Sequence, residues 1–245
     1  MRLLGCLFYF CSFIAMAAPL APAKFSSSMM KPWGYQDAGQ PAQGLLVNFA
    51  RKLCEEADIA MENSLKPYPR VIKDIQAGTA DFAVMFAGAT SEDIAVDLGP
   101  VVELKVMAVA KAGSAAIANI DALAGQRVGV IRGSIYGPEI DDNPSIDRIS
   151  FNDTVQGIQM LLLGRIDVMI ATNYSIDFAL KQLHADIERL TPIYQLATRQ
   201  GHLYWSKQSL QQEQAARLRN ALERLREQGV LSEIFSIDAS LALTL

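Results

Sequence analysis

Cysteine and histidine are scarce in this chain, and their scarcity excludes several kinds of site. The 245 residues include three cysteines and two histidines. Cys6 and Cys11 lie near the start, so Cys54 is alone in the rest of the chain and an internal disulfide is excluded there. His184 and His202 lie far apart and in no metal-ligand spacing. We therefore expect no zinc or redox-metal centre and no cofactor.

The sequence also lacks an excess of basic residues. It has 22 Lys and Arg against 26 Asp and Glu, which gives a formal net charge of −4. A protein that binds nucleic acid usually carries a basic stripe, so nucleic acid is not an expected partner. A GxSxG motif is absent, and the glycine-rich stretch 125–137 has neither the GxGxxG nor the GxxxxGK[ST] spacing.

The first residues have the pattern of an export signal. Met1 and Arg2 give a short basic start, and residues 3–20 carry no charge. Alanines at 15 and 17, and again at 21 and 23, fit the requirements of a signal peptidase. The sequence predicts a cleaved signal peptide over residues 1–23 and a protein located in the periplasm.

The remaining chain alternates strand and helix patterns, which predicts an α/β fold. Apolar runs predict strands, and apolar residues three and four positions apart predict helices between them. The small-residue segment 111–119 and the strand 201–206 are interpreted as two crossings. They predict lobe 1 over residues 24–110 and 202–245, lobe 2 over residues 111–201, and a ligand cleft between the lobes. The expected strands are 25–31, 58–64, 81–86, 101–110, 127–131, 146–151, 166–171 and 189–198, and the expected helices are 45–57, 68–78, 135–141, 155–163, 174–184 and 208–228.

The stretch GQRVGVIRGSIYG, residues 125–137, joins one of these strands to a helix through a tight polar turn. Backbone N–H groups at such a turn can face an anionic or polar group, with Arg132 and Ser134 beside them. An ordinary strand-to-helix connection explains the glycines equally well.

Several segments together resemble a known family. In order they are KPWGY, QGLLVNFARKLCEE, AGTADFAVMFAGAT, VDLGP, IDALAGQRVGVIRGSIYG, LLLGRIDVMIAT and LRNALERLREQGVLSEIF. Their order and spacing resemble the periplasmic solute-binding proteins of ABC importers, in the group that mostly takes polar amino acids (bacterial extracellular solute-binding protein family 3). The resemblance implies the two-lobe type II fold with two crossing strands as a hinge. It also implies a monomer that delivers a small polar solute to an ABC permease or a membrane sensor protein.

The resemblance also implies where the solute is bound. The family uses an aromatic residue from the loop after the first strand, groups after the DFAVMF strand, the turn of the second lobe, and the residue that ends the LLLGRIDVMIA strand. On this sequence these positions are Trp33 or Tyr35, then Phe86, Gly88 and Thr90, then the turn from Arg132 to Ile135 with Ser134, and finally Thr172.

This sequence departs from the family at the residues that hold an α-amino acid. Asp93 stands where the family has the arginine that pairs with the ligand carboxylate. Thr172 replaces the aspartate that holds the ammonium group, and Gly88 replaces a small hydroxyl residue. Charged pairs in a closed cleft contribute strongly to affinity. A standard α-amino acid is therefore not the expected solute.

Two replacements for this clamp are open. Arg70 and Arg132 could face each other across the cleft and hold an organic anion. Asp93 could instead attract a cation, with ring faces from Trp33, Tyr35 and Tyr68. Each of the three charged residues could also be an ordinary solvated side chain.

The expected function is non-catalytic binding. The alternative is a periplasmic enzyme on the same scaffold, similar to cyclohexadienyl dehydratases. An enzyme of this kind needs a cleft carboxylate with a raised pKa beside arginines. Asp93 near Arg70 or Arg132 is the one candidate for that arrangement.

Overall fold

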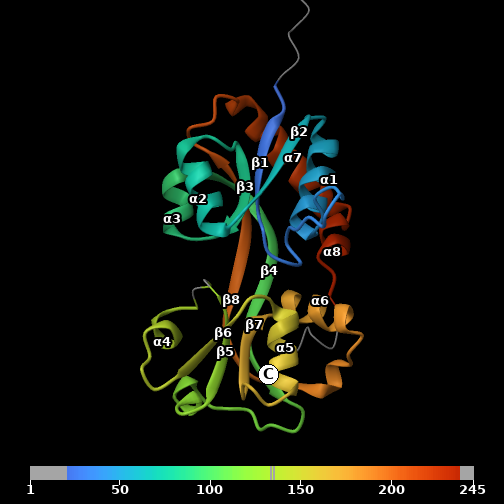
Figure 1. Ribbon diagram of the computed structural model, residues 1–245. Helices are drawn as coiled ribbons and strands as arrows, with labels where there is room; N and C mark the ends of the chain where they lie inside the picture. Colours follow the sequence, from blue (N-terminus) through green and yellow to red (C-terminus); the bar gives the residue numbers. More distant parts are fainter. Residues whose placement is uncertain (1–20, 133, 135, 238–245) are drawn as a thin grey trace, which may run out of the picture.

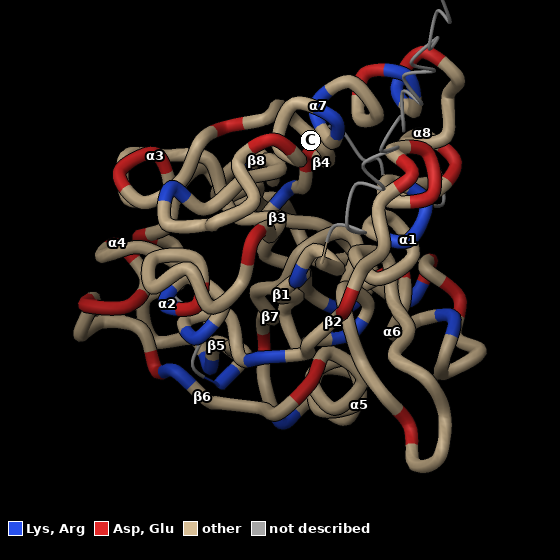
Figure 2. The backbone as a smooth tube through the Cα atoms, turned by 90° about the horizontal axis from the view of Figure 1, so that it is seen from above, with Lys and Arg blue, Asp and Glu red and all other residues tan. Residues whose placement is uncertain are grey.

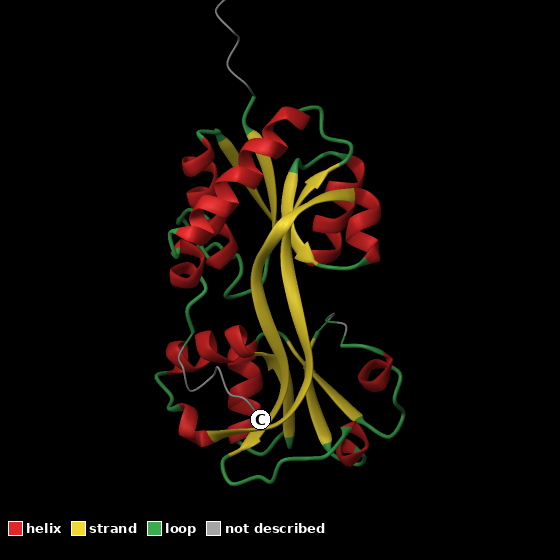
Figure 3. Cartoon of the chain, turned by 180° about the vertical axis from the view of Figure 1, so that it is seen from behind, coloured by secondary structure: helices red, strands yellow, loops and turns green. Residues whose placement is uncertain are grey.

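Two lobes joined by two long strands make up the structure, a computed structural model that describes residues 21–132, 134 and 136–237 (Figure 1). The predicted signal peptide falls mostly on residues 1–20, which lie outside the described residues. The joining strands are β4 (Ala95–Lys111) and β8 (Leu190–Ser206), and each is 17 residues long. Seen from behind, both run without interruption from one lobe to the other (Figure 3).

Lobe 1 is built on parallel strands in the order β2-β1-β3, with β8 added antiparallel to β3. Helices α1, α7 and α8 pack together on one side of the sheet, and α2 and α3 pack on the other (Figure 1). The strands are β1 (Ala23–Ser28), β2 (Met61–Lys66) and β3 (Phe82–Phe86), and the helices are α1 (Leu45–Ala57), α2 (Tyr68–Ala77), α3 (Ala89–Ile94), α7 (Gln212–Glu227) and α8 (Val230–Ile234).

Lobe 2 repeats this arrangement, with parallel strands in the order β6-β5-β7 and β4 added antiparallel to β7. This confirms the predicted α/β fold with two crossing strands. The strands are β5 (Arg127–Ile131), β6 (Asp147–Phe151) and β7 (Val168–Thr172), the helices are α4 (Pro138–Asp141), α5 (Thr154–Leu162) and α6 (Asn173–Leu183), and two 3₁₀ helices cover η1 (Ile120–Leu123) and η2 (Ile187–Arg189).

The crossing points differ from those predicted. Residues 106–110 of β4 already pair with β7 of lobe 2, so the chain has crossed before segment 111–119. Residues 201–205 of β8 pair with β3 and belong to the sheet of lobe 1. The strand was expected only from residue 101, after Gly99 and Pro100, whereas β4 begins at Ala95. Register shifts beside both residues instead let β4 continue through them.

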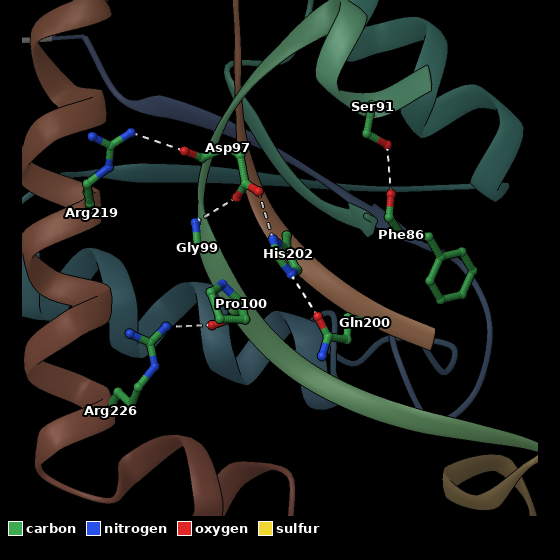
Figure 4. A network of polar contacts seen from close by, with 9 residues as sticks. All are labelled: Phe86, Ser91, Asp97, Gly99, Pro100, Gln200, His202, Arg219 and Arg226. Atoms are coloured by element: carbon green, nitrogen blue, oxygen red, sulfur yellow. Dashed lines mark hydrogen bonds and ion pairs between the residues drawn. The ribbon is translucent and has the colours of Figure 1, made fainter. Parts of the chain in front are cut away.

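A polar network fixes the crossing strands at their lobe 1 end (Figure 4). The Nδ1 atom of His202 on β8 lies 2.8 Å from Oδ2 of Asp97 on β4. Oδ1 of Asp97 accepts a hydrogen bond from the N–H of Gly99 at 2.8 Å. Arg219 and Arg226 of α7 donate to backbone carbonyl groups of β4 at Asp97 and Pro100. Any bending of the hinge is therefore expected beyond Pro100.

Charged residues are interspersed over the described chain, with both signs on each lobe (Figure 2). No helix among the described residues is long and apolar enough to cross a membrane. Each lobe has its own apolar core, and the larger core of lobe 1 includes Phe49, Leu53 and Cys54 on α1.

Cys54 is expected to resist thiol reagents as long as the protein is folded. Its side chain is buried, and burial raises the pKa of the thiol to about 12, with a smaller contribution from Glu55. Only the thiolate reacts, so at pH 8 we expect alkylation of native Cys54 to be about a thousandfold slower than in the urea-unfolded chain. Mass spectrometry of the Cys54 peptide after timed iodoacetamide treatment measures both rates. Equal rates would show that the thiol is accessible in the native state.

Candidate functional site

A cavity of about 730 Å³ lies between the lobes and is lined by both of them. Lobe 1 contributes the loop after β1, residues 29–36 apart from Pro32 and Trp33, together with Leu65 at the end of β2. Lobe 2 contributes the carboxyl ends of β5 and β6, the first turn of α5, and the face of α6 from Ser175 to Gln182. Ligands of open α/β sheets bind at the carboxyl ends of strands, and the volume is in the range of small-molecule sites.

The lobe 1 wall is a loop tied to the start of α1. Tyr35 and Gln43 exchange two backbone hydrogen bonds of 2.8 Å, which close the loop. The amide groups of Leu45 and Leu46 at the start of α1 donate to carbonyl oxygens of the loop. Within it, the Lys31 ammonium lies 5.0 Å from the centre of the Tyr35 ring. This loop presents one cation and one aromatic ring to the cavity.

Three hydrogen bonds fix the backbone that forms the lobe 2 wall. The amide of Arg132, just after β5, donates to the Phe151 carbonyl oxygen at 2.9 Å. Asp153 caps α5, because its Oδ1 accepts a hydrogen bond from the N–H of Gln156 at 2.9 Å. The Gln156 side chain in turn accepts from the N–H of Asn152. The Arg132 guanidinium is exposed and has no hydrogen bond or ion pair with any described residue.

Aromatic pairs join the lobes beside the cavity. The Trp33 ring lies 5.1 Å from the ring of Tyr174 on α6, and the Tyr35 ring lies 5.9 Å from that of Phe178. The Tyr174 hydroxyl donates to the carbonyl oxygen of Phe235 at 2.9 Å, and burial raises the pKa of this tyrosine. Tyr174 therefore belongs to lobe 2 by sequence but packs into the core of lobe 1.

Of the residues predicted to bind solute, Tyr35 and Arg132 line the cavity. Trp33 does not, because its side chain is 6% exposed and belongs to the core. Ser134 lies in the turn after Arg132, where its amide donates to the Ile131 carbonyl oxygen. Thr172 acts as the cap of α6, with its hydroxyl oxygen accepting from the N–H of Ser175 and donating to the Ser175 hydroxyl.

The other predicted residues lie away from the cavity lining. The Tyr68 hydroxyl accepts a hydrogen bond from the N–H of Phe86 at 3.0 Å, their rings are 5.5 Å apart, and burial raises the pKa of Tyr68. Phe86 is 42% exposed at the end of β3. Arg70 is exposed and pairs with Asp74 on its own helix at 3.2 Å. Thr90 is exposed on α3.

The predicted carboxylate beside arginines is not formed at the cavity. Asp93 is exposed on α3 and does not line it, and the carboxylate partner of Arg70 is Asp74. Within residues 21–132, 134 and 136–237, no cluster of His, Cys, Asp or Glu could hold a metal ion.

Sequence reasoning missed several residues of the lining. Lys31 belongs to the KPWGY segment, from which only the aromatic residues were selected. Met29 and Met30 were assigned to the end of the expected strand 25–31. Phe178 follows Tyr174 by one helical turn, which is the spacing of an ordinary core stripe. Strand ends and first helical turns on lobe 2 were the available signal, because ligands of this fold class bind there.

Comparison with known proteins identifies the fold. No protein-family model matches the chain, and no curated protein sequence matches it significantly. An ancestral arginine-binding protein bound to arginine is 18% identical with a TM-score of 0.68, over 87% of this chain and 96% of that one. A histidine kinase sensor domain with similarity to periplasmic binding proteins is 16% identical, with a TM-score of 0.67 over 88% and 94% of the two chains. The arginine-, lysine-, histidine-binding protein ArtJ of Geobacillus stearothermophilus is 20% identical, with a TM-score of 0.64 over 91% and 99%. The chain therefore has the two-lobe α/β fold of periplasmic binding proteins.

Proposed function

We propose that this protein is a non-catalytic, extracytoplasmic binding protein that closes its two lobes on a small polar solute. The observation that carries the proposal is the cavity of about 730 Å³ between the lobes, lined from both sides. A solute that contacts both walls favours the closed arrangement, because it gains contacts there that the open arrangement lacks. The arginine-binding protein and the arginine-, lysine-, histidine-binding protein with the same fold support a binding function.

The solute is proposed not to be a standard α-amino acid. Thr172 stands where the resembling family has an ammonium-binding aspartate, and its hydroxyl caps α6. Asp93 stands where that family has the carboxylate-binding arginine, and it does not line the cavity. Neither charge of the amino-acid clamp is therefore supplied from these positions.

The partner is proposed to be an ABC permease or a membrane sensor protein, with the binding protein acting as a monomer. Structures with this fold include both the substrate-binding protein of an amino acid ABC transporter and a histidine kinase sensor domain. Co-purification with the membrane component after crosslinking in the presence of solute would distinguish the two.

A thermal-shift screen over amino acids, organic acids and amines tests the binding function. A solute at about 100 times its Kd stabilises the folded state by about 2.7 kcal/mol, which raises the Tm of a chain this size by about 5 °C or more. Small-angle X-ray scattering should then show a smaller radius of gyration with the same solute. A screen in which no compound moves either quantity would sink the proposal. A strong response to ordinary α-amino acids would refute only the solute class.

The mature chain is proposed to begin at Ala18, after the first of the two small-residue sites, and not at Lys24, where the expected signal peptide over residues 1–23 would place it. Ala23 is fully buried in β1, and its N–H donates to the Ala60 carbonyl oxygen at 2.8 Å. The N–H of Lys24 donates to the Asp81 carboxylate at 2.8 Å. Cleavage after Ala23 would remove a paired strand residue and turn this amide into a chain end. Mass spectrometry of periplasmic protein checks the terminus, and a chain that begins at Lys24 would contradict the prediction.

A further inference from the structure

We propose that the cavity takes an organic anion, specifically a carboxylate carried on an apolar body without an ammonium group beside it. This inference rests on the proposed function, because it names the class of solute held by the same cavity. It is carried by the charges, the free donors and the apolar side chains of the lining.

The described lining has an excess of positive charge. Lys31 enters it from lobe 1 and Arg132 from lobe 2, while Asp153 is the one carboxylate among the described lining residues. One oxygen of Asp153 is engaged within the protein, since its Oδ1 accepts the capping hydrogen bond from the N–H of Gln156 at 2.9 Å. An anion that enters the cavity therefore meets two cations and one carboxylate, whose Oδ1 caps α5.

Arg132 is the strongest donor for such an anion. Its amide is fixed to Phe151 at 2.9 Å, but its guanidinium has no partner among the described residues. By contrast, Arg70 is held by Asp74, and the arginines of α7 at 219 and 226 are held by carbonyl groups of β4. A guanidinium matches a carboxylate with two parallel hydrogen bonds. The Arg132 guanidinium at the cavity, unpaired among the described residues, is therefore suited to bind a ligand carboxylate.

Lys31 supplies the second cation from the opposite wall. Its ammonium lies over the Tyr35 ring and 3.9 Å from a carboxylate oxygen of Asp37, and the two side chains are 38% and 60% exposed. Exposed pairs of this kind are weak, so a ligand anion can compete with Asp37. A carboxylate between Arg132 and Lys31 would attract both lobes and favour closure.

The rest of the lining indicates an apolar body. Met29 is 55% exposed and Met30 is 36% exposed, and Leu65, Tyr35 and Phe178 lie with them around the cavity. Methionine and aromatic side chains adapt to apolar ligands and gain free energy when water is removed from them. An ammonium group would meet two cations and a single carboxylate among the described lining residues, that of Asp153, one oxygen of which already caps α5. Burying a charge without a full partner is costly.

Isothermal titration calorimetry with four compounds that share one body tests this inference. The compounds are phenylacetate, phenylacetamide, 2-phenylethylamine and phenylalanine. We expect phenylacetate to bind about tenfold or more tightly than the amide, because the amide lacks the charge that Arg132 recognises. The amine and phenylalanine should bind more weakly still. The same comparison with 4-methylpentanoate, its amide and the corresponding amine keeps the result independent of the ring.

Arg132→Gln should weaken carboxylate binding about tenfold or more, and Lys31→Gln should weaken it severalfold. Arg165→Gln is the matched control, because Arg165 is an exposed arginine of lobe 2 that does not line the cavity. Equal affinities of the Arg132 and Arg165 variants would overturn the anion site, as would tighter binding of the amine or phenylalanine. In both cases, any compound that binds would still support the proposed binding function. A failure of all compounds in these titrations and in the wider thermal-shift screen would overturn both proposals.

Discussion

Tyr174→Ala is expected to lower the free energy of unfolding by about 3–5 kcal/mol, the cost of truncating a buried aromatic residue. The ring is 6% exposed, packs 5.1 Å from Trp33, and its hydroxyl donates to the Phe235 carbonyl oxygen. Alanine would leave a void at the junction of the lobes and a carbonyl group without its donor. Urea denaturation followed by circular dichroism measures the change.

Tyr174→Phe is the matched control for this experiment. It keeps the ring and removes only the hydroxyl, so we expect a loss of about 1 kcal/mol. A much larger loss of stability in Tyr174→Ala than in Tyr174→Phe would show that ring packing contributes more than the hydrogen bond. Equal losses would mean that the hydrogen bond to Phe235 carries the contact, and two negligible losses would show that the junction does not contribute to stability.

The same substitution should also loosen the lobes relative to each other. The neighbours of Tyr174 on α6, such as Ile176 and Ala179, pack in the core of lobe 2, while Tyr174 itself packs in the core of lobe 1. The helix is therefore anchored in both lobes. We expect Tyr174→Ala to increase the radius of gyration of the solute-free protein in X-ray scattering, and Tyr174→Phe to leave it unchanged.

Local patterns were sufficient to predict most of the fold. Residues 127–131 form β5 as expected, and the predicted strand 81–86 is observed as Phe82–Phe86. Both are short apolar runs between turns, and such runs form buried strands with little influence from distant residues. The crossing strands could not be placed in this way. A strand that changes its pairing partner has no local sequence feature at the point of change. The expected strand 101–110 also began after Gly99 and Pro100, although β4 runs through both residues.

The candidate site was predictable only in part, because its residues depend on contacts between distant parts of the chain. Trp33 lies between a proline and a glycine, which suggests an open loop, yet the Tyr174 ring covers it. Thr172 has a hydroxyl that can serve a ligand or cap a helix, and only the position of Ser175 shows that it caps α6. Tyr35 was predicted from the family resemblance, which implies an aromatic residue in the loop after the first strand. Arg132 was predicted from the turn that follows the strand 127–131.

Gly44→Ala should disturb the cavity wall and the stability of lobe 1 together. Gly44 precedes α1 with φ of 122° and ψ of 168°, a conformation that is essentially restricted to glycine. A Cβ atom there would lie 2.6 Å from the Trp33 carbonyl oxygen and 2.8 Å from Cα of Gly34. Both neighbours are backbone atoms, so a change of side-chain rotamer cannot relieve the clash. We expect a loss of about 3 kcal/mol in the free energy of unfolding.

The loop after β1 must move to accommodate the methyl group of this variant, and Tyr35 and Lys31 move with it. We therefore expect weaker solute binding as well as lower stability. Gly39→Ala provides the control, because Gly39 lies in the same loop with φ of 75° and a Cβ atom there would have no neighbour within 4 Å. It should cost about 1–2 kcal/mol from backbone strain alone and leave affinity unchanged. If both variants lost the same stability and bound solute normally, the tight contact between Gly44 and the Trp33 backbone would have no part in shaping the cavity.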